Sequence, residues 1–298
     1  MQTGNDNLKG VLIMALGMLL IPGMDAIAKY VGPRVSVGQI VWCRFFFQTL
    51  FMGSVALLFL NKEQLRFSHP LQHLARATMI SLATGLFFTA LQYMPLAESI
   101  AIFFVEPLIL TVLAGVFLKE KIGWRRILAV TIGFGGAMMI VQPEFAKAGW
   151  AAALPMGAAL AFAIYLLLTK RLSGHTHPVA IQLFTGAGAT LVMSVALAAG
   201  AALQLRPLAP AWPASNDLYL LIGMGLIASV GHLFVVMAFA RTSAATLAPL
   251  QYLEIVSATL LGLYFFGDFP DLIAWTGVAV IIGSGIFVAW RERLNAKD

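Results

Sequence analysis

Five ionisable side chains interrupt long apolar stretches of this sequence, and any chemistry of the chain is expected to involve them. They are Asp25, Arg44, Glu98, Glu106 and Glu254. A charged side chain is costly in an apolar interior, so it is retained where it pairs with another charge or where function uses it. These residues are therefore the first candidates for a binding or coupling site.

Glu106 and Glu254 fall near the centres of two apolar stretches. A carboxyl group shielded from water can take up and release a proton near neutral pH, which proton-coupled transport requires. The alternative is structural, because such a carboxyl group can also bond to backbone groups of a broken helix. Pro107 removes one backbone N–H directly beside Glu106. Both interpretations remain open from the sequence.

Arg44 has two interpretations. It lies in the outer half of its apolar stretch, at a depth similar to Asp25 and Glu98, and an ion pair with one of them would stabilise its charge. Its planar guanidinium group would also suit the carboxylate of a bound solute. Asp25 has a further structural option, since Lys29 follows it by four residues on the same expected helix.

Several polar and aromatic residues could complete a binding site. His232 lies in the middle of an apolar stretch, and histidine titrates near physiological pH, although a lone interior histidine also serves in packing. Gln251 and Tyr252 lie one turn before Glu254, while Trp42 and Tyr165 are amphipathic rings. Each could be a packing residue. Facing one cavity, they would suit an organic solute with apolar and polar parts.

The composition places these residues in a membrane protein. The chain has 298 residues, of which 60% are hydrophobic and 11% are charged, and its mean hydropathy is +0.88. A soluble domain carries about 25% charged residues. The composition therefore argues against a soluble enzyme and a disordered chain. The single cysteine, Cys43, excludes an internal disulfide and a cysteine-based metal site. No metal or cofactor is expected.

Ten apolar stretches are long enough to cross a bilayer, which takes about 20 residues in a helix. They cover residues 8–29, 36–60, 74–94, 96–118, 124–142, 149–170, 178–201, 216–240, 244–266 and 271–290. The loops between them are too short to hold a soluble domain. The sequence predicts an all-α membrane protein with ten transmembrane helices.

The basic residues predict the orientation of these helices, because cytoplasmic loops are enriched in Lys and Arg. With the amino terminus inside, 14 of the 19 Lys and Arg residues fall on the inner side, 4 fall outside, and Arg44 lies within a span. The inner group includes Arg76, at the inner end of the third span. We expect both termini in the cytoplasm. The net charge of +6 then reports topology, and no nucleic-acid partner is expected.

The two halves of the chain are related by an offset of 148 residues. Under this shift Glu106 falls on Glu254, Thr111 on Thr259, and Gly135 on Gly283. Five spans per half is an odd number, so the second half must insert upside down. Inverted repeats of this kind are typical of secondary transporters, whose binding site lies near the midplane between the halves. We predict two five-helix repeats, at 1–147 and 148–298.

The end of each half resembles the drug/metabolite transporter superfamily, in particular its EamA-type repeats. The first half reads Glu106-Pro107-Leu108, Phe117-Leu118-Lys119-Glu120 and Gly133-Phe134-Gly135-Gly136; the second reads Leu253-Glu254-Ile255, Phe265-Phe266-Gly267-Asp268, Trp275-Thr276-Gly277 and Gly283-Ser284-Gly285. The proline of the first half has Ile255 at its place in the second. The resemblance implies a ten-helix transporter of small organic solutes, usually an exporter, with importers among its members.

Together these features predict a secondary transporter in a bacterial inner (plasma) membrane that exports amino acids or related metabolites by alternating access. Its partners would be a small-molecule substrate and the lipid bilayer, with proton coupling as a further expectation. The oligomeric state stays open, and a monomer is compatible with the sequence. A multidrug or other metabolite transporter, working in uptake or export, is the alternative. An intramembrane lipid-modifying enzyme would instead require clustered His, Asp or Ser at one membrane face.

Overall fold

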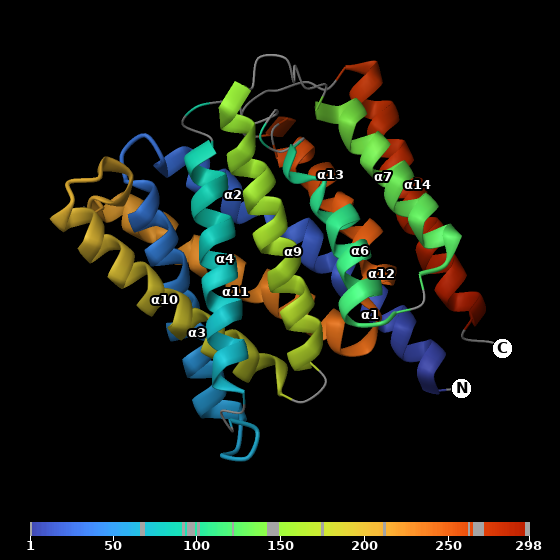
Figure 1. Cartoon of the computed structure of the whole chain (residues 1–298), viewed down its shortest axis with the longest axis horizontal. Helices are drawn as coiled ribbons and strands as arrows, with labels where there is room; N and C mark the ends of the chain where they lie inside the picture. Colours follow the sequence, from blue (N-terminus) through green and yellow to red (C-terminus); the bar gives the residue numbers. More distant parts are fainter. Residues whose placement is uncertain are drawn as a thin grey trace.

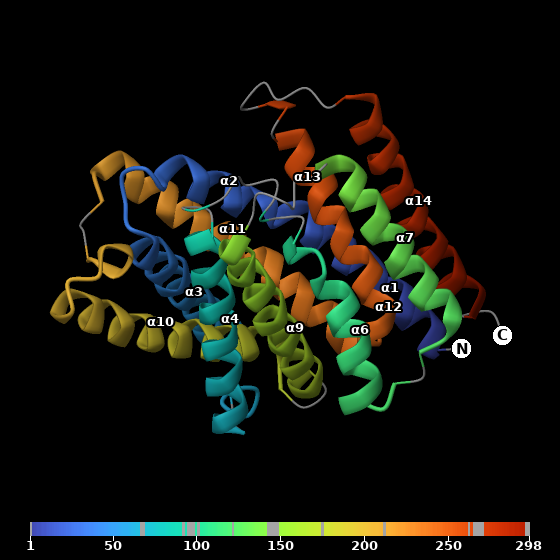
Figure 2. The same ribbon diagram turned by 45° about the horizontal axis from the view of Figure 1, so that its top comes forward.

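The computed structural model describes residues 2–65, 69–90, 93, 99, 102–120, 122–141, 149–173, 176–210, 213–261, 263–264 and 271–295. Over these residues the chain is helical and contains no strand, which confirms the predicted all-α fold (Figure 1). Most helices run between the two ends of one bundle (Figures 1 and 2).

The described residues of the first half form six helices, which lie in the five predicted spans. They are α1 (Gln2–Leu20), α2 (Pro22–Val31), α3 (Val37–Phe59), α4 (Pro70–Ala90), α6 (Glu106–Phe117) and α7 (Trp124–Val141). The first span divides into α1 and α2 because Pro22, at the start of α2, has no N–H to continue the hydrogen-bond pattern. The α3 helix begins after Ser36, whose hydroxyl accepts a hydrogen bond from the Gln39 N–H.

The second half follows the same order. Its elements are η1 (Gly149–Ala152), α9 (Ala153–Ser173), α10 (Pro178–Ala202), η2 (Arg206–Leu208), α11 (Ser215–Arg241), α12 (Ala244–Leu247), η3 (Ala248–Tyr252), α13 (Leu253–Leu261) and α14 (Leu272–Asn295). Between Ala244 and Leu261 the ninth predicted span thus divides into three pieces, and Pro249 lies in the middle piece, the 3₁₀ segment η3. Such a break inside a span often marks a hinge or a functional site.

Six continuous helical runs of the described residues are long and apolar enough to cross a membrane alone. They are Asp6–Val31, Val37–Phe59, Trp150–Ser173, Pro178–Ala202, Ser215–Arg241 and Ala244–Leu261. Helices α6, α7 and α14 contain shorter apolar segments, and α4 carries the basic residue Arg76. Large apolar side chains such as Leu57, Val116 and Leu191 lie on the outside of the bundle, as expected for a surface in contact with lipid.

The helices of the two halves pack in exchanged pairs. Contact between α1 and α11 has its counterpart in contact between α9 and α4, while α3 packs on α10 and α7 on α14. Individual contacts repeat as well. Gly277 packs against the Gly136 carbonyl oxygen, and Ser284 donates a hydrogen bond to the carbonyl oxygen of Ala129 at 3.0 Å. A shift of 148 residues converts one contact into the other with the halves exchanged, as a two-fold relation between inverted repeats requires.

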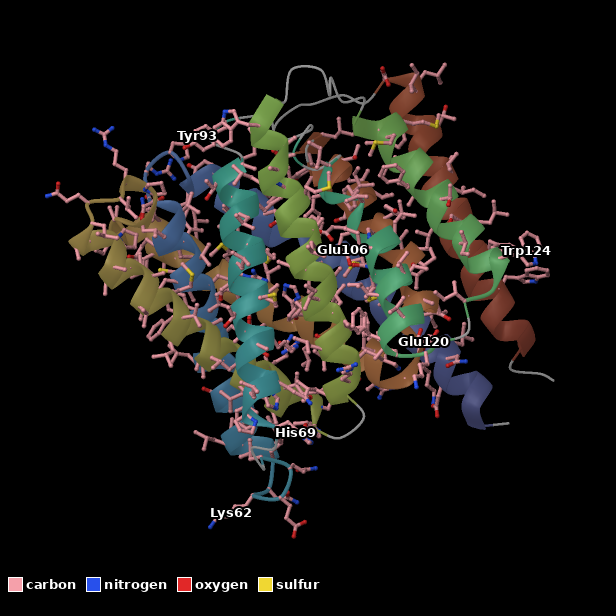
Figure 3. The ribbon with its side chains drawn as sticks, viewed as in Figure 1. Lys62, His69, Tyr93, Glu106, Glu120 and Trp124 are labelled. Atoms are coloured by element: carbon pink, nitrogen blue, oxygen red, sulfur yellow. The ribbon has the colours of Figure 1, made fainter. Side chains whose placement is uncertain are left out.

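The two termini lie at the same end of the bundle (Figure 1). Lys62, His69 and Glu120 lie toward this end as well (Figure 3). An even number of membrane crossings requires this placement. The side of the membrane to which this end belongs stays a prediction from the basic residues.

Candidate functional site

The interior of the bundle holds a set of polar side chains that come from both halves. Arg44 on α3, Glu106 at the start of α6 and His232 on α11 are each no more than 2% exposed. Gln251 and Tyr252, which are neighbours in η3, are buried as well. Glu106 lies in the middle of the molecule (Figure 3). The broken ninth span positions Gln251 and Tyr252, since η3 interrupts a regular helix there.

Arg44 links the two halves through neutral partners. Its Nη1 donates a hydrogen bond of 2.6 Å to the hydroxyl of Thr84 on α4, and its Nη2 bonds to Nε2 of His232. The 148-residue shift relates Thr84 to His232. A single arginine therefore connects equivalent positions on α4 and α11, near the pseudo-two-fold axis. Thr84 was not anticipated, although the repeat applied to His232 would have pointed to it.

The expected direct ion pair between Arg44 and Asp25 is wrong. No carboxylate of the described residues lies within 4.0 Å of Arg44. Asp25 and Glu254 interact with Arg44 only at longer range. The depth of a residue in its span could not predict this result, because it does not say which helix faces give access to which neighbours. Glu98, the other expected partner, lies outside the described residues.

The acidic side chains form a second part of the site. Glu254 interacts electrostatically with Asp25, and Glu106 interacts with Glu254. The two glutamates, which are equivalent in the repeat, thus lie within electrostatic range of each other. Tyr252 donates a hydrogen bond of 3.2 Å to the carbonyl oxygen of Phe104. These two residues are also equivalent under the 148-residue shift, so the pseudo-two-fold axis passes between them.

Four of the candidate residues contain buried polar atoms without a hydrogen-bond partner. These atoms are Arg44 Nε, Glu106 Oε1, His232 Nδ1 and Gln251 Nε2. Buried polar groups in folded proteins are nearly always paired, because leaving one unpaired costs free energy. The set includes hydrogen-bond donors and an acceptor. It could therefore bind a solute that carries both kinds of group.

A second buried arginine lies near the start of α4. Arg76, counted among the residues of the inner membrane side, is 0% exposed and lies between α4, α9 and α10. Its Nε donates to Thr169 at 2.7 Å, its Nη1 donates to Thr185 and to the Ile181 carbonyl, and its Nη2 donates to the Tyr165 hydroxyl at 3.0 Å. These neutral oxygens stabilise the buried charge, and nothing in the charge pattern of the sequence shows them.

Tyr165 connects Arg76 to the site. Its ring lies under the Arg76 guanidinium group at 4.5 Å and packs edge-on against the ring of His232 at 6.1 Å. Trp42 is not part of this arrangement. Its indole N–H donates to Ser194 on α10 at 2.8 Å, and its ring stacks on Phe46.

A carboxylate joins the halves at the end of the bundle that holds the termini. Glu120, just after α6, accepts hydrogen bonds from the backbone N–H groups of Ala244 at 3.1 Å and Ala245 at 3.0 Å. These residues begin α12, so the carboxylate caps that helix across the two halves. Lys119 has a φ of 55°, and this turn directs Glu120 toward α12. Glu120 lies below α6 (Figure 3).

Lys170 of α9 stabilises the carboxyl-terminal end of α11, the helix that precedes α12. Its ammonium group donates to the carbonyl oxygens of Phe239 at 2.8 Å and Thr242 at 2.6 Å, where α11 ends. Lys170 and Glu120 also interact electrostatically. We refer to Glu120, Lys170 and the α11–α12 connection that they hold as the Glu120–Lys170 clamp.

In the part of the chain that the structure describes, no group of three His, Cys, Asp or Glu side chains could hold a metal ion. The polar atoms of the site are donors and acceptors suited to an organic solute.

Comparison with known proteins gives consistent results. The EamA-like transporter family matches twice, over residues 8–142 and 149–290. A riboflavin transporter of Rhizobium johnstonii is 32% identical over 83% of this chain and 80% of its own. An S-adenosylmethionine uptake transporter of Rickettsia conorii is 26% identical over 98% of both chains. A pseudopaline exporter of Pseudomonas aeruginosa is 26% identical over 92% of this chain and 93% of its own.

A solved crystal structure has the same fold. It matches with a TM-score of 0.77 and 16% sequence identity, over 94% of this chain and 96% of the other.

Proposed function

We propose that this chain, which belongs to the EamA-like transporter family, moves a solute of amino-acid type by proton-coupled alternating access. It is an integral membrane transporter of small molecules, not an enzyme. The main support for this proposal is the set of buried polar atoms without a hydrogen-bond partner on Arg44, Glu106, His232 and Gln251. They lie where the equivalent residues of the two halves meet, and a site between inverted repeats can face either side of the membrane in turn.

The charges of the site suit a solute with an acidic and a basic group. The Arg44 Nε atom and the His232 ring are positioned to bind a carboxylate, since the remaining Arg44 nitrogens already bond to Thr84 and His232. The carboxyl oxygen atoms of Glu106, Glu254 and Asp25 can accept hydrogen bonds from an ammonium or other cationic group. An amino acid or a metabolite that contains one has both groups.

Glu106 and Glu254 are proposed to carry the coupled proton. Glutamine keeps the shape of the side chain and its ability to form hydrogen bonds, but it cannot ionise. We therefore expect Glu106→Gln, and to a lesser extent Glu254→Gln, to retain exchange of solute while accumulation driven by a pH gradient falls sharply.

The test uses the purified protein in liposomes, with and without a pH gradient. A counterflow panel of amino acids, S-adenosylmethionine, riboflavin, nucleosides, sugars and cationic drugs first identifies a transported solute. Glu63→Gln is the matched control, because Glu63 is an exposed carboxylate in the loop after α3. Equal accumulation in all variants, or none above equilibration, would reject coupling through Glu106 and Glu254.

Export is the direction that the family resemblance suggests. Uptake is a second candidate, favoured by the S-adenosylmethionine uptake transporter that aligns over 98% of both chains. The direction of the pH gradient that drives accumulation in oriented vesicles distinguishes the two.

We further propose that both termini lie in the cytoplasm of a bacterium, with the chain in the inner membrane. Reporter tags at the carboxyl terminus and in the loop after Leu60 should report cytoplasm. A tag in the connection between η2 and α11 should report the outside, and an outside carboxyl terminus would contradict the proposed orientation.

A further inference from the structure

Aromatic rings form a continuous row through the interior of the bundle. From one end, the row consists of Tyr252, Phe104, Phe103, Phe162 and Tyr165. Neighbouring ring centroids are 5.8, 6.2, 5.7 and 5.4 Å apart. We call these five residues the aromatic row. They come from η3, from the segment before α6, and from α9, so only the folded chain brings them together.

The aromatic row joins the two groups of unpartnered polar atoms. At one end Tyr165 and Phe162 pack against the ring of His232, at 6.1 and 6.5 Å, and His232 bonds to Arg44. At the other end Tyr252 follows Gln251, whose side chain lies near Glu106 although its Nε2 atom makes no hydrogen bond. A solute that reached both polar groups would therefore lie along the row.

The row contains rings of two kinds. Tyr165, Tyr252 and Phe104 are buried, and hydrogen bonds hold the two tyrosine hydroxyl groups in place. Phe103 and Phe162 are only partly buried, although they lie between these fixed rings. Aromatic rings prefer offset or edge-on contacts with other rings. Phe103 also packs edge-on against Phe87, with the ring centroids 5.3 Å apart. The exposed part of Phe103 and Phe162 is the surface on which a further flat ring could pack.

We propose that the transported solute carries a planar aromatic or heteroaromatic ring between polar groups, and that Phe103 and Phe162 select it by stacking. This inference rests on the proposed function and deepens it by specifying the solute class. The polar ends of the solute bind at Arg44 with His232 and at Glu106 with Gln251. The ring occupies the intervening aromatic row, where stacking adds affinity that an acyclic solute of equal charge does not gain.

The test compares solutes that differ in the ring. S-adenosylmethionine is compared with S-methylmethionine, riboflavin with ribitol, and tryptophan with leucine, each as a competitor and as a counterflow solute in proteoliposomes of the full chain. We expect at least one ring-bearing member to be preferred over its partner on the order of tenfold in apparent affinity. Phe103→Leu and Phe162→Leu should remove that preference while the ringless partner is unaffected.

Phe239→Leu is the matched control, because Phe239 is a fully buried phenylalanine of α11 outside the aromatic row. The inference is wrong if the protein prefers no ring-bearing solute over its ringless partner. It is also wrong if the Phe103 and Phe162 variants lose affinity equally for both members of a pair. The comparison on the unmodified protein needs no variant, so it decides the matter even where a leucine variant does not fold. If ringless amino acids accumulate with the pH gradient as well as ring-bearing solutes do, the proposed function stands and the ring selection is wrong.

Discussion

Removing the Glu120 carboxylate should open the end of the bundle that holds the termini. In the structure each carboxylate oxygen accepts one backbone N–H at the start of α12, at 3.1 and 3.0 Å. Glu120→Ala leaves both N–H groups without this partner and removes negative charge near Lys170. The segment released, α12, continues directly into η3 and α13, which carry Gln251 and Glu254. The change therefore acts on the helix that forms half of the proposed site.

The expected size follows from the two lost hydrogen bonds. Loss of a helix N-cap costs about 0.5–2 kcal/mol, and the ionised acceptor places this case near the upper end, at about 2 kcal/mol. If the clamp forms only when this end is closed, the open population rises roughly 30-fold, since about 1.4 kcal/mol corresponds to tenfold. Glu120→Gln offers one neutral acceptor oxygen, so its open population should lie between that of the unmodified protein and that of Glu120→Ala.

Thiol labelling measures this opening. Cys43 is the single cysteine and is buried, so a Cys43→Ser background can carry one new cysteine at Ala245, which is 0% exposed. Its rate of reaction with a membrane-impermeant reagent reports how often the clamp opens. Glu63→Ala controls for loss of an exposed carboxylate. An unchanged rate in Glu120→Ala would refute the closing role of the clamp.

Two further predictions use matched pairs of variants. A Cβ atom at Gly133 would lie 2.4 Å from the buried Tyr252 ring, whereas one at Gly135 of the same helix would meet nothing within 4 Å. Gly133→Ala should therefore lower the stability of the protein in detergent by about 1–3 kcal/mol and slow transport. Equal effects of Gly133→Ala and Gly135→Ala would contradict this prediction. Arg76→Met removes four hydrogen bonds inside the bundle, so it should lower the unfolding temperature. Arg241→Met, at an exposed helix end, should leave the unfolding temperature unchanged. Equal unfolding temperatures of the two variants would show that the buried hydrogen bonds of Arg76 contribute little.

The sequence alone determined the class of protein and the positions of the ionisable residues within its apolar spans. Apolar runs of bilayer length identified the spans, because backbone groups in lipid must be satisfied within a helix. The glutamates at 106 and 254 stood out since charge is rare at such depth. Their equivalence followed from the 148-residue offset, which the pairing of Phe104 with Tyr252 now reproduces in space.

The tertiary structure decided which side chains meet. Arg44 bonds to Thr84 and His232 instead of a carboxylate, and Arg76 is buried among hydroxyl groups that the charge pattern of the sequence does not show. The aromatic row joins residues from η3, from the segment before α6 and from α9. Hydropathy gives the depth of a residue along its helix. It does not give the rotation of that helix or its neighbours, because helices in lipid pack through specific side-chain contacts that no single apolar stretch encodes.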